Sequence, residues 1–236
     1  MLILALDTTM AGCSLALVGG RADQPETLFS QQMAMRHGQA ESLLPAIASA
    51  LDQIDKTPQD ITVVAATTGP GAFTGIRVGL AAARGFALSL GCPGIGVDGF
   101  TLYRAMATEA GHPPAADGHL IAIDSRRAEH YLSASLGDQV VDHSLALTDI
   151  EPWLDRVGTP KAGWVITGDL ADAVAQNLTR HSARLVAQQL PDPVILARLA
   201  IDRLDDPKSH PLNPVYHRPP DATPAKPTRI WLADQD

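Results

Sequence analysis

Three polar segments carry the side chains whose types and spacing could do chemistry. Asp7, in the segment 7–9 (DTT), follows an apolar run, so its carboxylate either contacts a metal-bound phosphate or hydrogen-bonds the backbone of its own turn. His37, within residues 36–39, is a candidate base, ligand or helix-capping side chain. The charged segment 124–129 (DSRRAE) is either solvated or faces a substrate. We favour the turn role for Asp7, and a structural role for His37, which has no partner residue in a recognisable motif.

A glycine-rich turn is the next candidate. Residues 69–71 (GPG) follow the apolar run 61–66 and indicate a strand that ends in a tight turn. Thr74 is expected to cap a helix that continues through residues 76–90. Such turns at helix N-termini suit anions. The phosphate-loop pattern GxxxxGK[ST] is nevertheless absent, because Ile and Arg follow Gly75, so a Walker-type site is excluded.

Small residues recur every fourth position along this helix, at Gly75, Gly79, Ala83 and Ala87. A spacing of four aligns them on one face. Each glycine in a helix interior costs roughly 1 kcal/mol relative to alanine, so close approach of another backbone is expected there. That backbone belongs either to the protein's own sheet or to a partner.

Other common site signatures are missing. HExxH, CxxC and GxSxG do not occur, and the eight histidines form no ligand pair at helical spacing. The two cysteines, Cys13 and Cys92, are expected to be free buried thiols, which suits a reducing cytoplasm. The start MLILALDTT has no basic segment and reads as a buried strand, and no apolar run reaches the length of a membrane span.

Composition sets the outer limits. The chain has 236 residues, of which 45% are hydrophobic, and this supports a globular fold with a real core. A formal net charge of −8 argues against an autonomous nucleic-acid binder, because such proteins neutralise phosphates with a basic face.

The elements that must position these groups repeat in two series. The first is predicted to contain strands at 2–6, 13–18, 27–35, 61–66 and 93–97 and helices at 39–54 and 76–90, with a kink or early start at Pro45. The second is predicted to contain helices at 101–110, around Leu154, at 170–178 and at 194–204, and strands at 119–124, 129–136, 139–147, 164–167 and 184–187. Three strands, a helix, a strand and a helix in each series indicate an internal duplication with mixed sheets. Residues 211–227 contain six prolines and are predicted to be extended or without regular structure.

The chain resembles the TsaB (YeaZ) family. The resemblance rests on LDTTMAGCSLAL, RHGQAESLLPAI, GPGAFTGIRVGLAAARGFALSLGCPGIGV, IDSRRAEHYLSA and PVYHR, in this order along almost the whole chain. It implies an α/β fold of the duplicated actin/Hsp70/sugar-kinase (ASKHA) type, with two mixed-sheet subdomains and flanking helices. We expect subdomains at residues 1–98 and 99–206 and a proline-rich tail at 207–236.

The resemblance also implies a function. Family members act in making threonylcarbamoyladenosine (t6A) at position 37 of tRNAs that read codons starting with A. Such a protein is the partner of a catalytic TsaD paralogue, works with the ATPase TsaE, and meets tRNA only through the complex. Alone, it is expected to form a homodimer.

Departures from the catalytic relative bear on mechanism. Gly99 and Tyr103 stand where that relative has two metal-binding histidines, and neither side chain supplies an imidazole nitrogen. Only Gly168 stands where nucleotide-binding relatives have a glycine pair. We therefore expect a non-catalytic subunit with no metal or cofactor of its own, and ATP or ADP at the complex interface. The alternatives are a stand-alone ATPase or kinase of this fold and, third, a metallopeptidase, which would require zinc.

The partner interface is predicted on the two helices of the first series. The residues assigned to it are His37, Leu43, Leu44, Ile47, Leu51, Gly75, Arg77, Gly79, Ala83 and Ala87. The apolar and small residues among them are expected to form a helical bundle with the paralogue. Ile76, Leu80 and Phe86 are assigned to the opposite, core-facing side.

Overall fold

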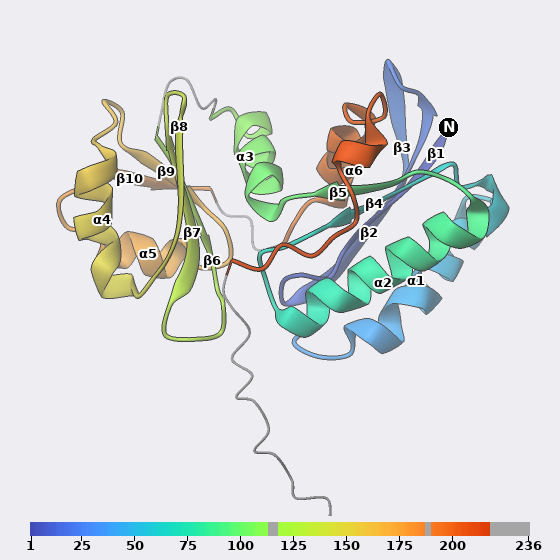
Figure 1. The fold of residues 1–236 in the computed structure, drawn as a ribbon, viewed down its shortest axis with the longest axis horizontal. Helices are drawn as coiled ribbons and strands as arrows, with labels where there is room; N and C mark the ends of the chain where they lie inside the picture. The colour runs from blue at the N-terminus through green and yellow to red at the C-terminus, as the bar shows by residue number, and fades with distance from the viewer. Residues whose placement is uncertain (113–117, 187–189, 218–236) are drawn as a thin grey trace, which may run out of the picture.

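Each half of the chain folds into a five-stranded mixed sheet with helices packed against it (Figure 1). The structure is a computed structural model and describes residues 1–112, 118–186 and 190–217. The proline-rich residues 218–227 and Ala187, the end of a predicted strand, lie outside the described residues.

The first half builds its sheet in the order β3-β2-β1-β4-β5. Its elements are β1 (Leu2–Asp7), β2 (Gly12–Arg21), β3 (Gln24–Ala34), α1 (Gln39–Gln53), β4 (Val63–Thr67), α2 (Phe73–Leu90) and β5 (Gly94–Val97). Strands β1, β2 and β3 form the expected antiparallel meander, whereas β4 and β5 join in parallel after helical crossovers.

The second half repeats this arrangement, with its strands in the order β10-β9-β6-β7-β8. Its elements are α3 (Gly99–Glu109), β6 (Gly118–Ile123), β7 (His130–Leu136), β8 (Gln139–Leu145), α4 (Ile150–Val157), β9 (Trp164–Thr167), α5 (Ala171–Asn177), β10 (Ala183–Leu185) and α6 (Pro193–Ile201). Strand β6 pairs antiparallel with β7 and parallel with β9, as β1 does with β2 and β4. The predicted duplication is therefore confirmed in the topology.

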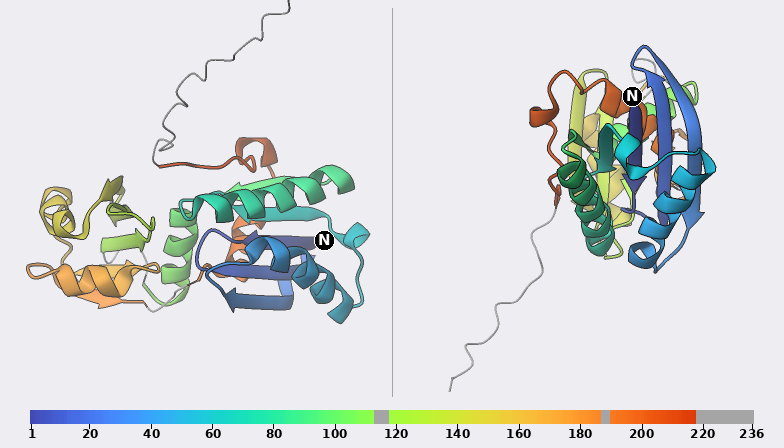
Figure 2. Two further views of the ribbon diagram at one scale, coloured as in Figure 1. Left: turned by 90° about the horizontal axis from the view of Figure 1, so that it is seen from below. Right: turned by 90° about the vertical axis from the view of Figure 1, so that its right-hand side faces the viewer.

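Helices cover both faces of the first sheet, which explains why β1 is a continuous apolar run (Figure 2). Leu4 and its same-face neighbours pack with α1 and α2. Ile3 and Ala5 point the other way and pack with residues of α3 and α6. A third cluster fills the second half between its sheet and α4 and α5.

The last helix packs against the first half of the molecule. Helix α6 falls within residues 99–206, yet Leu196 and Ala200 pack in the same cluster as Ile3 and Ala5 of the first sheet. Its apolar face therefore packs on the first sheet, although its residues fall in the range predicted for the second subdomain. Helix α3 lies between the two halves (Figure 1). The subdomain boundaries stay predictions.

One helix detail differs from expectation. Helix α2 begins at Phe73 with Ala72 as its N-cap, so Thr74 lies inside the first turn and is not the cap. Helix α1 runs through Pro45, as predicted, and the kink expected there stays a prediction.

Residues 210–217 run along the first half as an extended strap. The amide of Gly96 donates to the His210 carbonyl (2.8 Å), and that of Val215 donates to the Thr68 carbonyl (2.8 Å). The side chain of Leu212 is 7% exposed and joins the core beneath α2. Within the described residues, no helix has the length and apolar character needed to cross a membrane.

Candidate functional site

The turn after β1 is a closed structure. The Thr9 amide and hydroxyl both donate to the Asp7 carboxylate, at 3.1 and 2.9 Å. Burial raises the pKa of Asp7 above its ordinary value, and the hydrogen bonds from Thr9 oppose this. Because Asp7 is 2% exposed, its carboxylate serves the turn, as predicted, and is not open to a phosphate.

Helix α2 covers this turn with its glycines. A methyl group at Gly75 would overlap the Thr8 carbonyl, and one at Gly79 would lie 2.6 Å from the Thr8 hydroxyl oxygen. The Thr8 hydroxyl in turn donates to the Gly75 carbonyl (2.7 Å). The small residues therefore let α2 approach the protein's own β1–β2 turn.

Most of the predicted partner interface is consequently core. Leu43, Ile47, Leu51, Gly75, Gly79 and Ala83 are buried, and Ala87 is half-buried. Leu44 is 55% exposed, and His37 and Arg77 are also exposed. The small residues were assigned to the side of α2 opposite Ile76 and Leu80, and this was wrong. Gly79 lies three positions after Ile76 and Ala83 three after Leu80, so they are neighbours on one buried side of the helix. Ile76 and Leu80 are buried as predicted, whereas Phe86 is only half-buried.

A different surface of these helices faces outward. We define the outer helix surface as the exposed residues Leu44 and Ala48 of α1 and Ala81, Gly85 and Leu88 of α2. The Leu88 side chain is 86% exposed, and a methyl group at Gly85 would meet nothing within 4 Å. This surface is apolar or small and has no covering element within the described residues.

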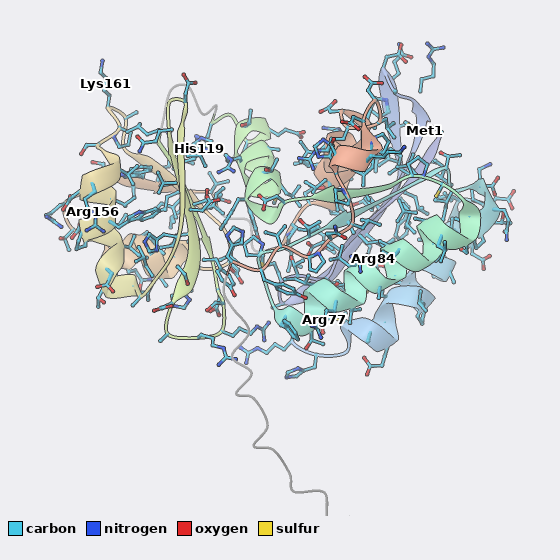
Figure 3. All side chains as sticks on the ribbon, viewed as in Figure 1. Met1, Arg77, Arg84, His119, Arg156 and Lys161 are labelled. Carbon is cyan, nitrogen blue, oxygen red and sulfur yellow. The ribbon has the colours of Figure 1, made fainter. Side chains whose placement is uncertain are left out.

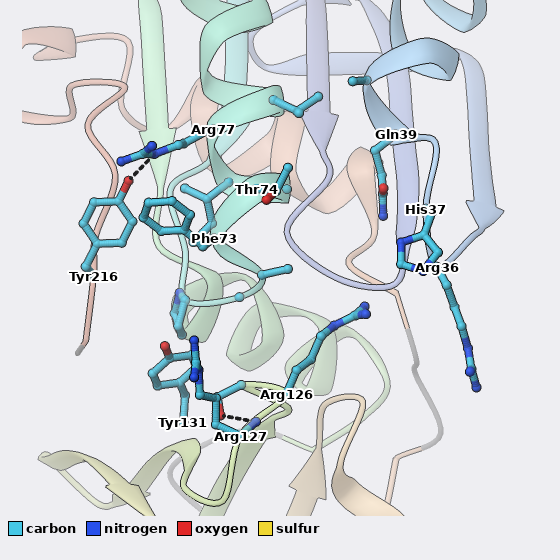
Figure 4. A pocket seen from close by; sticks show the side chains of 18 of the residues that line it. Arg36, His37, Gln39, Phe73, Thr74, Arg77, Arg126, Arg127, Tyr131 and Tyr216 are labelled. Atoms are coloured by element: carbon cyan, nitrogen blue, oxygen red, sulfur yellow. Dashed lines mark hydrogen bonds between the residues drawn. The ribbon is translucent and has the colours of Figure 1, made fainter. Parts of the chain in front are cut away.

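A cavity of about 880 Å³ opens beside the start of α2. Its wall combines the loop before α1, the first turn of α2, the loop between β6 and β7, and residues 215–217 of the strap (Figure 4). Four arginines line it, namely Arg36, Arg77, Arg126 and Arg127. We call this cavity the arginine pocket.

Local contacts fix one wall of the arginine pocket. The Arg77 guanidinium lies 3.8 Å from the centre of the Phe73 ring, and its Nε donates to the Tyr216 hydroxyl (3.3 Å). The Tyr216 ring packs on Phe73, with 5.6 Å between ring centres. The strap thereby holds Arg77 at the rim.

The opposite wall is a tight polar loop. The Asp124 carboxylate accepts from the Arg126 amide (2.7 Å), and the Ser125 hydroxyl accepts from the Arg127 amide (3.2 Å). Arg126 has a positive φ of 59°, which turns the backbone sharply at this point. The loop directs the Arg126 side chain toward the loop that carries His37 (Figure 4).

The positions that correspond to metal-binding histidines in the catalytic relative are filled. Tyr103 is fully buried, and burial, followed by the charges of Asp169 and Asp7, raises the pKa of its phenol well above the usual value. Asp169 accepts from the Asp124 amide (2.8 Å), and burial raises its pKa to about 6. Gly99 packs against the turn at Gly69, whose carbonyl accepts from the Gly99 amide (2.7 Å). The described residues contain no group of three His, Cys, Asp or Glu side chains that could hold a metal.

Two segments singled out in the sequence therefore meet in space. Residues 36–39 and 124–127 lie on opposite sides of the arginine pocket, although about ninety positions separate them. Phe73 and Tyr216 also form part of this wall, although neither was predicted as a site residue. The one available signal for Tyr216 was its place in the PVYHR segment.

The repeated strand order, with α3 between the halves and α6 packed on the first sheet, defines the duplicated actin/Hsp70/sugar-kinase class of fold. A family model described as "TsaD: tRNA N6-adenosine threonylcarbamoyltransferase" matches residues 31–157, which is more than half of the chain. The chain therefore belongs to this family.

Similar proteins agree with the TsaB (YeaZ) resemblance. The tRNA threonylcarbamoyladenosine biosynthesis protein TsaB of Buchnera aphidicola (Schizaphis graminum) is 26% identical over 71% of this chain and 78% of its own length. TsaB of Escherichia coli K12 is 35% identical, and the match spans 56% of this chain and about half, 53%, of that protein. The solved structure of YeaZ from Pseudomonas aeruginosa is 26% identical and superposes with a TM-score of 0.70, covering 91% of this chain and 99% of that one.

Proposed function

We propose that this chain is a non-catalytic partner subunit of a tRNA threonylcarbamoyladenosine transferase complex, in which it binds and activates a catalytic TsaD-like paralogue. The observation that carries the proposal is the filled centre between the halves. Tyr103 takes the place of a metal-binding histidine and is fully buried near Asp7 and Asp169. With this centre occupied by Tyr103, we propose that the chain acts by binding partners through its surface.

The outer helix surface is the proposed contact with the paralogue. Exposed apolar side chains such as Leu44 and Leu88 gain by leaving water, and small residues at Ala81 and Gly85 let a second helix approach closely. The paralogue has the same class of fold, so its equivalent helices form the matching half of a bundle. In the absence of the paralogue, the same surface pairs two copies of this chain as a homodimer.

The remaining members of the complex follow from the same proposal. A TsaE-like ATPase is the further partner, and ATP or ADP binds at the junction of subunits, because the Asp7 turn inside this chain is buried under α2. Transfer RNA is reached within the complex. The free thiols of Cys13 and Cys92 suit a cytoplasmic protein.

Charge substitutions on the outer helix surface test the docking. Leu44→Glu combined with Ala81→Glu places two carboxylates on exposed positions, so the fold should persist while co-purification with the paralogue falls at least tenfold. Gly79→Leu and Ala83→Glu are unsuitable, because both positions are buried in the core.

The matched control for this experiment is Val140→Glu, at a 51% exposed apolar position on β8 in the other half. It should leave binding unchanged, and circular dichroism should report the same fold for all variants. Undiminished co-purification by the folded Leu44/Ala81 variant would refute docking through this surface.

A further inference from the structure

The arginine pocket has a charge opposite to that of the whole chain. The protein carries a formal net charge of −8, yet four arginines line this one cavity, and among the described residues Glu41 is the single carboxylate in its wall. Within the described residues, Arg36 and Arg126 form no ion pair with a carboxylate. Arginines that line one cavity give it a positive field, so an anionic ligand would be attracted to it.

The arginines come from separate elements that the fold brings together. Arg36 precedes α1, Arg77 lies in the second turn of α2, and Arg126 lies in the loop after β6 (Figure 4). All three side chains are exposed at the rim. Helix α2 adds to the positive field, because its first turn faces the pocket and no side chain caps it.

We propose that the arginine pocket binds backbone phosphates of an RNA strand, namely the tRNA on which the complex acts; this inference rests on the proposed function. Guanidinium groups hold phosphate oxygens through charge-assisted hydrogen bonds. An RNA strand offers several phosphates in a row, which matches exposed arginines spread over three elements.

A compact nucleotide pocket is a poorer match. Polyphosphate cradles rely on glycines whose backbone amides approach the ligand closely. Here Gly71 packs against Thr9 and Gly75 packs against Thr8, so closely that an added methyl group would collide with the backbone. The arginines at the rim therefore suit an extended ligand, such as an RNA strand, that passes across the opening of the pocket.

The acidic remainder of the chain weakens RNA binding by this site when the chain is alone. The chain as a whole has a net charge of −8, which opposes RNA binding. Three or four phosphate contacts in the pocket therefore supplement RNA binding by the paralogue. Each phosphate contact contributes about 0.7 to 0.9 to the slope of log affinity against log salt concentration.

The test measures binding of an unmodified tRNA transcript to the full-length chain in complex with the paralogue, over a series of NaCl concentrations. Arg36→Ala combined with Arg126→Ala should weaken binding at least tenfold at moderate salt and lower the salt slope by about 1.4 to 1.8. Arg36→Lys combined with Arg126→Lys keeps the charges and should retain most of the slope.

The charge control is Arg156→Ala, an exposed arginine of α4 in the other half of the molecule from Arg77 (Figure 3). It should leave affinity and slope unchanged. If the double alanine variant matches this control, the pocket does not contact RNA. The inference would also be overturned if the variant lost binding of ATP or inorganic phosphate while its tRNA affinity stayed the same.

Size-exclusion chromatography of the same samples separates this inference from the proposed function. If the wild-type chain does not bind the paralogue, the proposed function fails. The tRNA titration is then made with the full-length chain alone at low salt, comparing the double alanine variant with Arg156→Ala. Equal binding by these two variants would overturn the inference.

Discussion

At the scale of single residues, the centre between the halves is occupied by protein. The Asp7 carboxylate is satisfied by Thr9, and the phenol of Tyr103 lies buried within reach of the charges of Asp7 and Asp169. Two carboxyl groups with raised pKa values and a phenol resemble a catalytic cluster by composition. The full burial of Tyr103 instead indicates a packed centre.

Asp169 allows a test by pH. Its pKa is about 6 in the folded chain against an ordinary value of 3.8, so the folded state binds this proton more tightly than the unfolded state. The stability that the proton contributes is fully present below the ordinary pKa and is lost as pH rises through about 6. Asp169→Asn keeps an oxygen to accept from the Asp124 amide and removes the titration.

The free energy of unfolding of Asp169→Asn, measured in urea, should therefore rise relative to wild type by about 2 to 3 kcal/mol between about pH 4 and pH 7. Asp138→Asn, in the exposed turn after β7, is the control for loss of one carboxylate. A difference between Asp169→Asn and wild type that is the same at both pH values would refute the raised pKa of Asp169.

At the scale of elements, α2 connects the turn after β1 with two surfaces. Its glycines close over Thr8, its first turn borders the arginine pocket, and its outer side belongs to the outer helix surface. The strap ties the helix down from outside, through Arg84 to Asn213 (3.0 Å) and Arg77 to Tyr216 (3.3 Å). The helix is therefore fixed before any partner binds.

Two glycines of α2 should respond oppositely to the same substitution. Gly75→Ala places a methyl group on the Thr8 carbonyl and should lower the free energy of unfolding by about 1 to 3 kcal/mol. Gly85→Ala meets no atom within 4 Å and should raise it by about 0.5 to 1 kcal/mol through helix propensity. Urea denaturation of both variants measures this, and similar effects would contradict the packing of α2 on the turn.

The elements themselves were predictable from hydrophobic periodicity and turn residues. Every predicted strand and helix is present within a few residues, because the apolar runs and their Gly and Pro boundaries are local signals. The side of α2 that faces the core was harder to predict from the sequence. A ladder of small residues fits a sheet or a partner equally well, and only the position of Thr8 beside Gly75 shows which backbone approaches.

The arginine pocket lay beyond sequence reasoning for a related reason. Residues 36–39 and 124–129 each looked like an isolated charged loop, and charge alone is usually solvated. Their meeting depends on how the two sheets face each other across α3, which is a long-range outcome of packing. The placement of α6 on the first sheet has the same origin.

At the scale of the whole molecule, a duplicated fold presents two surfaces that we propose are functional, the outer helix surface and the arginine pocket. Membership of the TsaD family accounts for the fold, and the buried Tyr103 and the packed Gly99 are the basis on which we propose a non-catalytic role for this chain. The outer helix surface and the arginine pocket both involve α2, so docking of the paralogue and contact with RNA are expected to occur side by side.

The most direct test of a non-catalytic, activating role is a subunit-omission assay of threonylcarbamoyl transfer to an unmodified tRNA transcript. The complete mixture of this chain, the TsaD-like paralogue, the TsaE-like ATPase and the threonylcarbamoyl-adenylate donor should modify the tRNA. Omitting this chain should reduce modification at least a hundredfold, and this chain alone should give none. Full modification without this chain, or modification by this chain in the absence of the paralogue, would contradict the account.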